Sequence, residues 1–195
     1  MTKPPALPVE GRPLRADAQR SLDALLEAAK IVFAKSGVDA PVREIADQAG
    51  VGLGTLYRRF PQRATLIAAV FRREMDGCAD AAQTLAAAHP PFEALTHWLQ
   101  HYATFVGTKR GLAQALHTGD PAYAALPAHF EERLRPAFHR LFDRAVQAGT
   151  VRRDVDADDL LRAVSGLCMS GYTQSPDQAQ RMIALLLDGL RYGAG

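Results

Sequence analysis

A chain of 195 residues, 48% of them hydrophobic, is long enough to bury a substantial core and has an ordinary globular composition. Its net charge of +2 excludes no class of partner, but no apolar run approaches the roughly 18 residues that a membrane-spanning helix needs. The proline-rich N-terminus lacks the apolar segment of a signal peptide, so we expect a cytoplasmic protein without a membrane partner. The two cysteines, Cys78 and Cys168, match no metal or redox spacing.

The chain is predicted to begin with a flexible arm over residues 1–15, because four prolines and a glycine interrupt this segment. A helix follows over about residues 17–36, and Gly37 ends it. Its apolar positions form one stripe, made of Leu22, Leu25, Leu26, Ala29, Val32 and Phe33. This stripe is available to cover the next two helices.

Residues 41–60 have the pattern of two short helices joined by a tight turn. The first helix has one apolar face, formed by Val42, Ile45 and Ala46. Gly50 suits the position just after that helix, where a left-handed backbone costs glycine nothing. The second helix repeats the apolar spacing at Leu53, Leu56, Tyr57 and Phe60. Such a helix-turn-helix is a common reader of the DNA major groove.

Polar and basic side chains on the other side of this motif are candidates for DNA contacts. Thr55, Arg58 and Arg59 lie on the exposed side of the second helix, and Arg43 lies near the start of the first. Residues 1–63 hold ten Lys or Arg against seven Asp or Glu, an excess of +3, whereas the remainder sums to −1.

Two further DNA contacts depend on the surroundings of the motif. Leu53 either contacts a thymine methyl group or packs on the turn. Arg12 and Arg15 end the arm, where arginines of this kind enter the minor groove, although a solvated tail is the alternative.

The motif resembles the DNA-binding core of the TetR family of bacterial repressors. The matching residues are Val42, Ile45, Ala46, Ala49, Gly50, Val51, Gly54, Thr55, Leu56, Tyr57 and Phe60, and the match extends to Phe33, Gly37 and Leu66. The resemblance covers about the first third of the chain. It implies that the Tyr57 hydroxyl and Arg63 contact the DNA backbone. Pro41, Gly52 and Leu53 depart from the family, which commonly has hydroxyl or polar side chains there.

The rest of the chain also predicts helices, so the expected fold is all-α with about nine helices. Proline and glycine punctuation separates helices over about 62–88, 91–108 and 127–148, and Pro136 is expected to kink the last of these or to shift its start. Asp156 caps a further helix, and a capping box at 175–178 begins the final one. By resemblance, residues 16–62 form the DNA-binding domain and residues 63–195 a ligand-binding and dimerisation domain.

The resemblance also implies a pocket for a small-molecule inducer among the middle helices. The candidate lining residues are Trp98, His101, Tyr102, Phe105, His117, Phe130, Met169 and Tyr172. For each aromatic residue among them, ordinary core packing is the alternative. His97 and His101 have a spacing that metal ligands use, but no third ligand supports a metal site, so we expect neither a metal nor a cofactor.

The last two helices are apolar over a wide arc, because Leu185, Leu186 and Leu187 are consecutive and cannot share one face. By resemblance these helices form a homodimer, and packing within a monomer is the alternative. The candidate interface residues are Gly166, Ser170, Met182, Leu186 and Leu190. A two-fold dimer would bind a palindromic operator in double-stranded DNA.

The chain contains none of the motifs GxSxG, HExxH, P-loop or dinucleotide fingerprint, so we do not expect an enzyme. We expect a ligand-responsive transcriptional regulator, in particular a repressor that a small molecule releases from its operator. The alternative is a helical ligand-carrying or enzymatic protein in which the helix-turn-helix is incidental.

Overall fold

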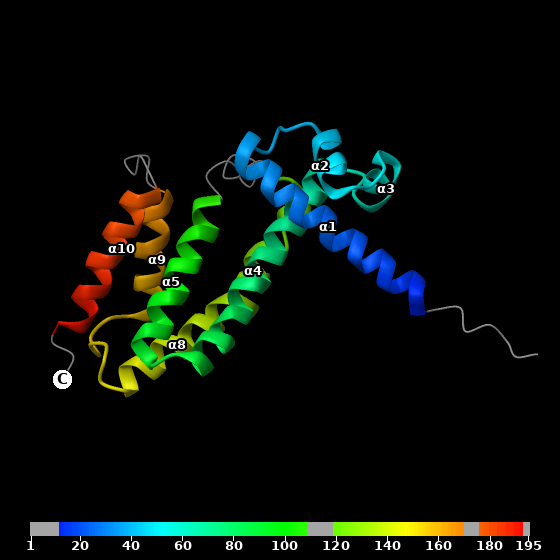
Figure 1. Ribbon diagram of the computed structural model, residues 1–195. Helices are drawn as coiled ribbons and strands as arrows, with labels where there is room; N and C mark the ends of the chain where they lie inside the picture. The colour runs from blue at the N-terminus through cyan, green and yellow to red at the C-terminus, as the bar shows by residue number, and fades with distance from the viewer. Residues whose placement is uncertain (1–11, 109–118, 170–175, 193–195) are drawn as a thin grey trace, which may run out of the picture. The chain divides into compact units, whose positions relative to one another are not determined.

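The computed structural model describes the backbone of residues 12–108, 119–169 and 176–192, and the side chains of 17–107, 119–169 and 178–192. Within these ranges the chain forms helices and turns and no β-strand, which confirms the all-α fold (Figure 1). The contacts divide the chain into two compact units, Met1–Val70 and Phe71–Gly195. The division falls inside helix α4 (Arg63–Ala88), shortly after the domain boundary proposed from the sequence.

The first unit is built on α1 (Arg12–Ser36), which takes in the last residues that the sequence assigned to the arm. The predicted apolar stripe is buried from Leu25 to Phe33, and α1 packs against α2 (Val42–Ala49), which in turn contacts α3 (Leu53–Arg59). Ile45 of α2 and Leu56 of α3 are almost completely buried in the same core. The three-helix arrangement expected from the spacing of apolar residues is therefore present.

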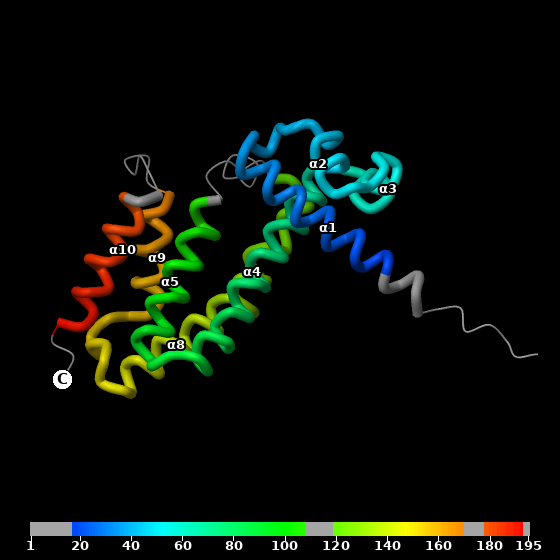
Figure 2. The backbone as a smooth tube through the Cα atoms, viewed as in Figure 1, coloured from blue at the N-terminus to red at the C-terminus, as the bar shows by residue number. Residues whose placement is uncertain are grey.

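The turn between α2 and α3 is fixed by backbone hydrogen bonds around Gly50. Gly50 has a left-handed conformation with φ 66° and ψ 30°, and its N–H donates to the carbonyl of Asp47. The N–H of Val51 donates to the carbonyl of Ala46 at 3.0 Å, which completes a Schellman motif. Figure 2 traces the backbone out of α2, through this turn and into α3.

The second unit is organised around α5 (Pro91–Thr108), which contacts α8 (Arg135–Gln147), α9 (Ala157–Met169) and α10 (Pro176–Arg191). The apolar side chains of α5 account for its central position, because Leu95, Trp98 and Leu99 are almost completely buried. α5 also contacts α10 through the guanidinium of Arg191, which lies 4.9 Å from the centre of the Phe92 ring.

The helix predicted over 127–148 is continuous but not uniform. After a short turn, η2 (Pro121–Tyr123), it begins as α7 (Leu126–His129), passes through a π-helical segment, η3 (Phe130–Leu134), and continues as α8. In η3 the N–H of Arg135 donates to the carbonyl of Phe130. Pro136 explains the wide turn, because proline lacks an N–H and its ring would clash with the carbonyl four residues earlier. The expected disturbance by Pro136 is thus a π turn.

Capping agrees with the sequence where the structure describes it. One carboxylate oxygen of Asp156 accepts from the N–H groups of Asp158 at 2.8 Å and Asp159 at 3.2 Å, as predicted for the start of α9. The predicted capping residue Ser175 lies outside the described residues. None of the helices that the structure describes combines the length and hydrophobicity needed to cross a bilayer.

Candidate functional sites

Helix α3 separates its buried and exposed residues sharply. Leu56 and Phe60 are buried, whereas Arg58 and Arg59 are exposed and Thr55 is half-buried. Tyr57 is 51% exposed, although the spacing placed it on the apolar face. Tyr57 directly follows Leu56 in the helix, so its side chain points to one side of the Leu56–Phe60 stripe. The exposed position leaves its hydroxyl free to reach outward, as a contact to DNA requires.

The other predicted DNA contacts are placed unevenly. Arg43 is exposed on the first turn of α2, and Leu53 is half-buried at the start of α3, which agrees with packing on the turn as well as with a contact to a base. The side chains of Arg12 and Arg15 lie outside the described residues. α2 and α3 both begin without a side-chain cap, since Pro41 and Gly52 occupy the cap positions and provide no hydroxyl.

Arg63 has a contact that sequence reasoning missed. Its Nη1 donates to the backbone carbonyls of Val38 and of Ala40, the latter at 2.7 Å, and both carbonyls lie in the connection between α1 and α2. One signal was available in the sequence: arginine is an unusual choice for the first residue of a helix, where the backbone dipole favours acidic side chains.

The aromatic residues predicted to line a pocket mostly pack against each other in the second unit. The ring centroid of Trp98 lies 5.3 Å from that of Tyr102 and 5.2 Å from that of Phe138, and all three residues are buried. Trp98 Nε1 donates to the carbonyl of Cys78 at 2.7 Å, which joins α5 to α4. Phe105 is also buried, with its ring centroid 6.1 Å from that of Tyr102.

The remaining predicted pocket residues are scattered. His101 is exposed and Met169 is 40% exposed, whereas His117 and Tyr172 lie outside the described residues. Two of the predicted residues, Tyr102 and Phe130, do line one cavity of about 290 Å³, which we call the Tyr102 cavity. It is lined by Tyr102, Phe130, Glu131, Arg135, Asp158, Leu161, Arg162 and Ser165.

Two hydroxyl groups form the inner polar wall of the Tyr102 cavity. The Tyr102 hydroxyl lies 2.7 Å from Ser165 Oγ, and Ser165 Oγ donates to the carbonyl of Leu161 at 2.9 Å. Because the serine proton is used for Leu161, the tyrosine is the donor in the first bond. Burial raises the pKa of Tyr102 to about 12, so this hydroxyl is neutral at physiological pH. The Tyr102 hydroxyl oxygen can still accept one hydrogen bond from another donor.

A group of charged side chains forms the outer wall of the same cavity. Arg135 binds Asp158 through Nε, at 2.9 Å, and through Nη2, and its Nη1 donates to Glu131 at 2.8 Å. His139 Nε2 lies 2.8 Å from Asp158 Oδ1. The hydrogen bonds from Arg135 and then His139 hold the pKa of the Asp158 carboxyl far below its usual range. These residues could not be identified from the sequence, because they lie on different helices, α8 and α9, and meet only in the folded chain.

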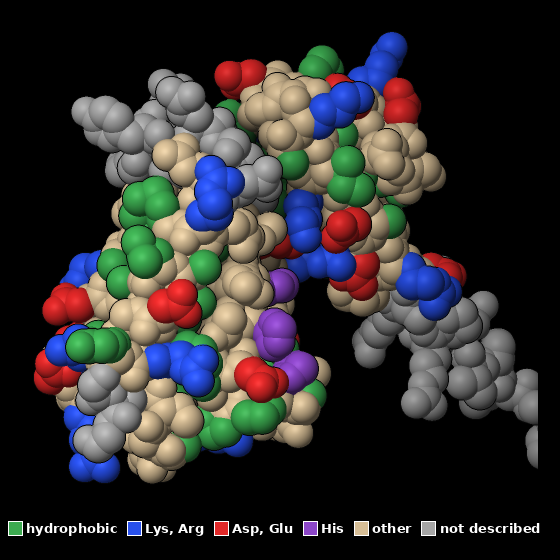
Figure 3. All heavy atoms as spheres, turned by 60° about the vertical axis from the view of Figure 1, so that its left-hand side comes forward, with side chains coloured by type: hydrophobic (Ala, Val, Ile, Leu, Met, Phe, Trp, Pro, Cys, Tyr) green, Lys and Arg blue, Asp and Glu red, His purple; other side chains and the backbone are tan. Residues whose placement is uncertain are grey.

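Other titratable groups also join separate helices. His129, the one polar or charged residue classed with the buried core in the described part of the chain, has Nε2 2.8 Å from Asp76 Oδ1 on α4. Histidines gather in a row on one face of the second unit (Figure 3), and the ring centroids of His89 and His97 lie 4.7 Å apart. Over the described parts of the chain, no three or more His, Cys, Asp or Glu side chains are arranged to hold a metal ion.

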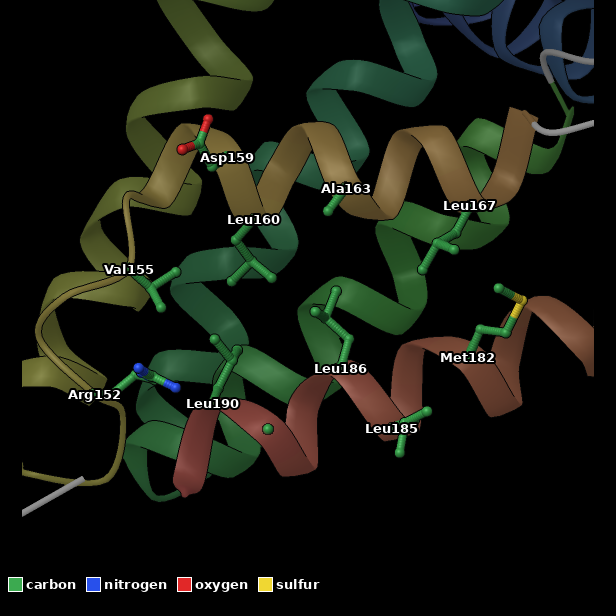
Figure 4. A pocket seen from close by; sticks show the side chains of 11 residues that line it. Arg152, Val155, Asp159, Leu160, Ala163, Leu167, Met182, Leu185, Leu186 and Leu190 are labelled. Atoms are coloured by element: carbon green, nitrogen blue, oxygen red, sulfur yellow. The ribbon is translucent and has the colours of Figure 1, made fainter. Parts of the chain in front are cut away.

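An apolar groove of about 640 Å³ lies between α9 and α10, and we call it the α9–α10 groove. Three of the predicted interface residues, Met182, Leu186 and Leu190, line it, and Leu186 points toward α9 while Leu185 points away from it (Figure 4). The side chain of Leu185 is 75% exposed. Hydrophobic side chains gather on the surface over these two helices (Figure 3). Ser170 lies outside the described residues, and Gly166 is exposed with no atom within 4 Å of the position a Cβ would take.

Comparisons with known proteins agree with both units. Residues 25–70 match the family model of bacterial regulatory proteins of the tetR family, and residues 90–192 match the C-terminal domain of SbtR-like transcriptional regulators. A TetR transcriptional regulator of Streptomyces coelicolor is 38% identical, with a TM-score of 0.75, over 87% of this chain and 97% of that one. A TetR regulatory protein of Mycobacterium vanbaalenii is 35% identical, with a TM-score of 0.72, over 92% of this chain and 99% of that one.

A curated relative supports the same assignment at lower similarity. An HTH-type transcriptional regulator of Staphylococcus aureus is 26% identical over 131 residues, which are 66% of this chain and 71% of the relative. These relatives are regulators of transcription and not enzymes, so the alternative of an enzyme or carrier with an incidental motif is wrong. The chain belongs to the TetR family of helix-turn-helix transcriptional regulators.

Proposed function

We propose that this regulator is a homodimeric repressor that binds a palindromic operator through α3 and is released by a small molecule. The observation that supports the DNA-reading surface most strongly is the exposure of Arg58 and Arg59 on a helix whose opposite side is buried. Arginine forms bidentate bonds with guanine and binds phosphate. The proposed surface consists of Arg43, Leu53, Thr55, Tyr57, Arg58 and Arg59, with Arg12 and Arg15 at the start of α1.

The dimer is proposed to form through the α9–α10 groove and the exposed apolar residues that line it. Met182 and Leu185 are 39% and 75% exposed, which is costly for large apolar side chains unless another surface covers them. A two-fold dimer would present two copies of α3 to successive major grooves about 34–36 Å apart. Gly166 on the exposed side of α9 would allow a close approach of the partner helix.

The inducer is proposed to bind in the Tyr102 cavity. The cavity offers an aromatic side, at Phe130, and hydroxyl groups, at Tyr102 and Ser165, which suit a small ligand with a polar group. Binding would release the operator only by favouring a conformation that binds DNA poorly, and such coupling is typically about 1–3 kcal/mol. The Arg135–Asp158 pair joins α8 to α9 at this cavity, so a ligand there would act on both helices at once.

DNA binding tests the first part of this proposal. An operator would be selected from random duplexes with the wild-type protein, and its affinity measured by fluorescence anisotropy. The double variant Arg58→Ala, Arg59→Ala should lose operator binding while keeping the oligomeric state of the wild type. The matched control, Arg140→Ala with Arg153→Ala, removes the same charge from exposed positions of the second unit and should bind normally. Equal loss in both variants would show a general charge effect and contradict the assignment of α3.

Release and repression need two further measurements. A reporter gene driven by the selected operator should be silent with the wild-type regulator and active with the Arg58→Ala, Arg59→Ala variant; higher expression with the wild type would indicate an activator. A thermal-shift screen of small aromatic compounds should find ligands that weaken operator binding. Replacing Ser165 by Ala should reduce the response to such a ligand without reducing operator affinity in its absence.

A further inference from the structure

We propose that Arg63 is a positioning residue for the helix-turn-helix: it holds the entry to α2 in place and does not serve as a phosphate contact. The inference rests on the proposed use of α3 as the DNA-reading helix. It departs from the role that family resemblance gives this position. The two roles predict different behaviour toward salt and DNA sequence, so they can be separated experimentally.

The geometry ties one nitrogen of the Arg63 guanidinium, Nη1, to the protein backbone. Nη1 carries two hydrogens, and they have two acceptors, the carbonyls of Val38 and of Ala40. The Nη1 to Ala40 oxygen distance is 2.7 Å, and the contacts are partly buried. The acceptors precede Arg63 by 25 and 23 residues, so the contact joins the first turn of α4 to the connection between α1 and α2.

An arginine at this position does not stabilise the helix that contains it. Arg63 is the first residue of α4, where the uncapped N–H groups make a positive charge unfavourable, and the first turn contains no acidic residue to offset it. Two carbonyl oxygens on the guanidinium compensate for that cost. The placement is therefore favourable because of the tertiary contact and not because of the helix that contains it.

Within the described residues, the connection held by Arg63 makes few other hydrogen bonds, although the Ala40 side chain is buried. It begins at Gly37, with φ 78°, and the N–H of Ala40 donates to the Gly37 carbonyl at a long 3.3 Å. Pro41 then starts α2 without a side-chain cap. The two bonds from Arg63 thus fix the chain immediately before α2 begins.

The position of α2 decides the position of α3. α2 packs against α1, and the Schellman turn at Gly50 joins it rigidly to α3. A change in how the chain enters α2 would therefore tilt the recognition helix. Binding to any DNA depends mainly on charge, whereas recognition of a particular sequence requires correctly placed side chains. Loss of Arg63 should reduce the preference for the operator more than it reduces binding to unrelated DNA.

Arg63→Gln and Arg59→Gln form a matched pair for the test, since each removes one positive charge within the first unit. Affinities of the full-length variants would be measured over a series of salt concentrations, on the selected operator and on a scrambled duplex of the same length and composition. Arg63→Gln should weaken operator binding about tenfold or more, as loss of hydrogen bonds to a charged group does, with little change on the scrambled duplex. The slope of log affinity against log salt should equal that of the wild type.

Arg59→Gln should behave differently. Loss of a phosphate contact reduces the salt slope by about 0.9 for each contact on both duplexes. A reduced slope for Arg63→Gln would identify a phosphate contact and overturn the proposal. A lower melting temperature with unchanged preference for the operator would identify a purely structural residue and also overturn it. If Arg59→Gln changes nothing, the proposed reading surface is wrong, while an effect of Arg63→Gln on operator preference would still stand.

Arg63→Lys covers the case in which Arg63→Gln fails to fold. Lysine keeps the charge but lacks the planar guanidinium that reaches both carbonyls. A positioning role predicts weaker operator preference with the salt slope of the wild type, whereas a phosphate contact predicts wild-type binding on both duplexes. The second result would overturn the proposal.

Discussion

Two tyrosines show how differently the two units use their side chains. Tyr57 of α3 is 51% exposed, whereas Tyr102 of α5 is 2% exposed and bonded to a serine on another helix. In the first unit a small core holds a short helix, and the side chains proposed to function project from it. In the second unit the polar groups of interest face a cavity between helices. The first kind of site is built from residues close together in the sequence, and the second from residues that lie on separate helices.

The same contrast appears in the hydrogen bonds. The turn at Gly50 is formed by residues within five positions of each other, such as Val51 and Ala46. The second unit is joined by bonds between distant residues, including Trp98 to Cys78 and Tyr102 to Ser165. A substitution at the Gly50 turn should therefore have local effects, and one in the second unit should affect the packing of several helices together.

The largest expected effect is that of Trp98→Ala. The side chain is completely buried between Tyr102 and Phe138, so its removal should destabilise the second unit by about 3–5 kcal/mol, as aromatic-to-alanine changes in cores do. Thermal unfolding followed by circular dichroism measures the loss. Trp98→Phe keeps a ring but lacks the donor to Cys78, and it should cost less. Similar stability of wild type and Trp98→Ala would show that this core is not tightly packed.

Gly50→Ala tests the turn of the first unit. An alanine would have to adopt the φ of 66° found here, which costs roughly 1–2 kcal/mol for a residue with a Cβ. Apart from the adjoining residues of the chain, no atom of the described residues lies within 4 Å of the new Cβ, so the cost is conformational and not steric. Chemical denaturation of the variant should show it. The matched control is Gly54→Ala inside α3, which has the ordinary helical backbone and should not be destabilised. Equal loss in both would point to a cause other than the left-handed turn.

Asp158→Asn should give a smaller loss of stability that depends on pH. The folded protein lowers the pKa of Asp158, so its contribution is present above the unfolded pKa of about 4 and is lost as the pH falls below it. Melting temperatures of wild type and variant should differ at pH 7 and converge as the pH falls below about 4. Asp159→Asn is the control, because Asp159 pairs with Arg162 on the surface, where ion pairs contribute little. A difference that stays constant down to acid pH would contradict the role of the charge.

The smallest effects are expected from removing single hydroxyl groups. Tyr57→Phe should leave stability unchanged within about 0.5 kcal/mol, since the residue is exposed, but should weaken operator binding by a few fold. Tyr102→Phe should lower stability and leave operator binding unchanged, because its hydroxyl is bonded to Ser165 within the second unit. Lower stability in Tyr57→Phe, or weaker operator binding with unchanged stability in Tyr102→Phe, would contradict these separate roles for the exposed and the buried tyrosine.

Local patterns in the sequence predicted the helices and the motif because they depend on residues a few positions apart. The spacing of Ile45, Leu56 and Phe60 gave the core of the first unit, and Gly50 and Asp156 were correctly identified as a turn and a cap. Tyr57 was misplaced, because apolar spacing alone does not show which side of a short helix is covered in the folded chain.

Contacts between distant residues were not predictable in this way. Aromatic residues occur both in ligand pockets and in cores, so residue type alone could not assign Trp98 and Phe105. The fold shows that they pack in the core beside Tyr102. The cluster of Arg135, Asp158 and His139 has no sequence spacing of its own, since α8 and α9 supply its members separately. Arg63 belongs to the same class, with acceptors more than twenty residues earlier.

The π turn at Phe130–Leu134 gives this helix a tolerance to changes in chain length. A turn closed between Phe130 and Arg135 contains one residue more than an α turn, so the residues of α8 face the core as they would if the chain were one residue shorter. Deleting one residue from 130–134 together with Pro136→Ala should therefore give a regular helix that still buries Phe138 and Leu141. The turn therefore accommodates one extra residue in this chain without rotating the buried face of α8.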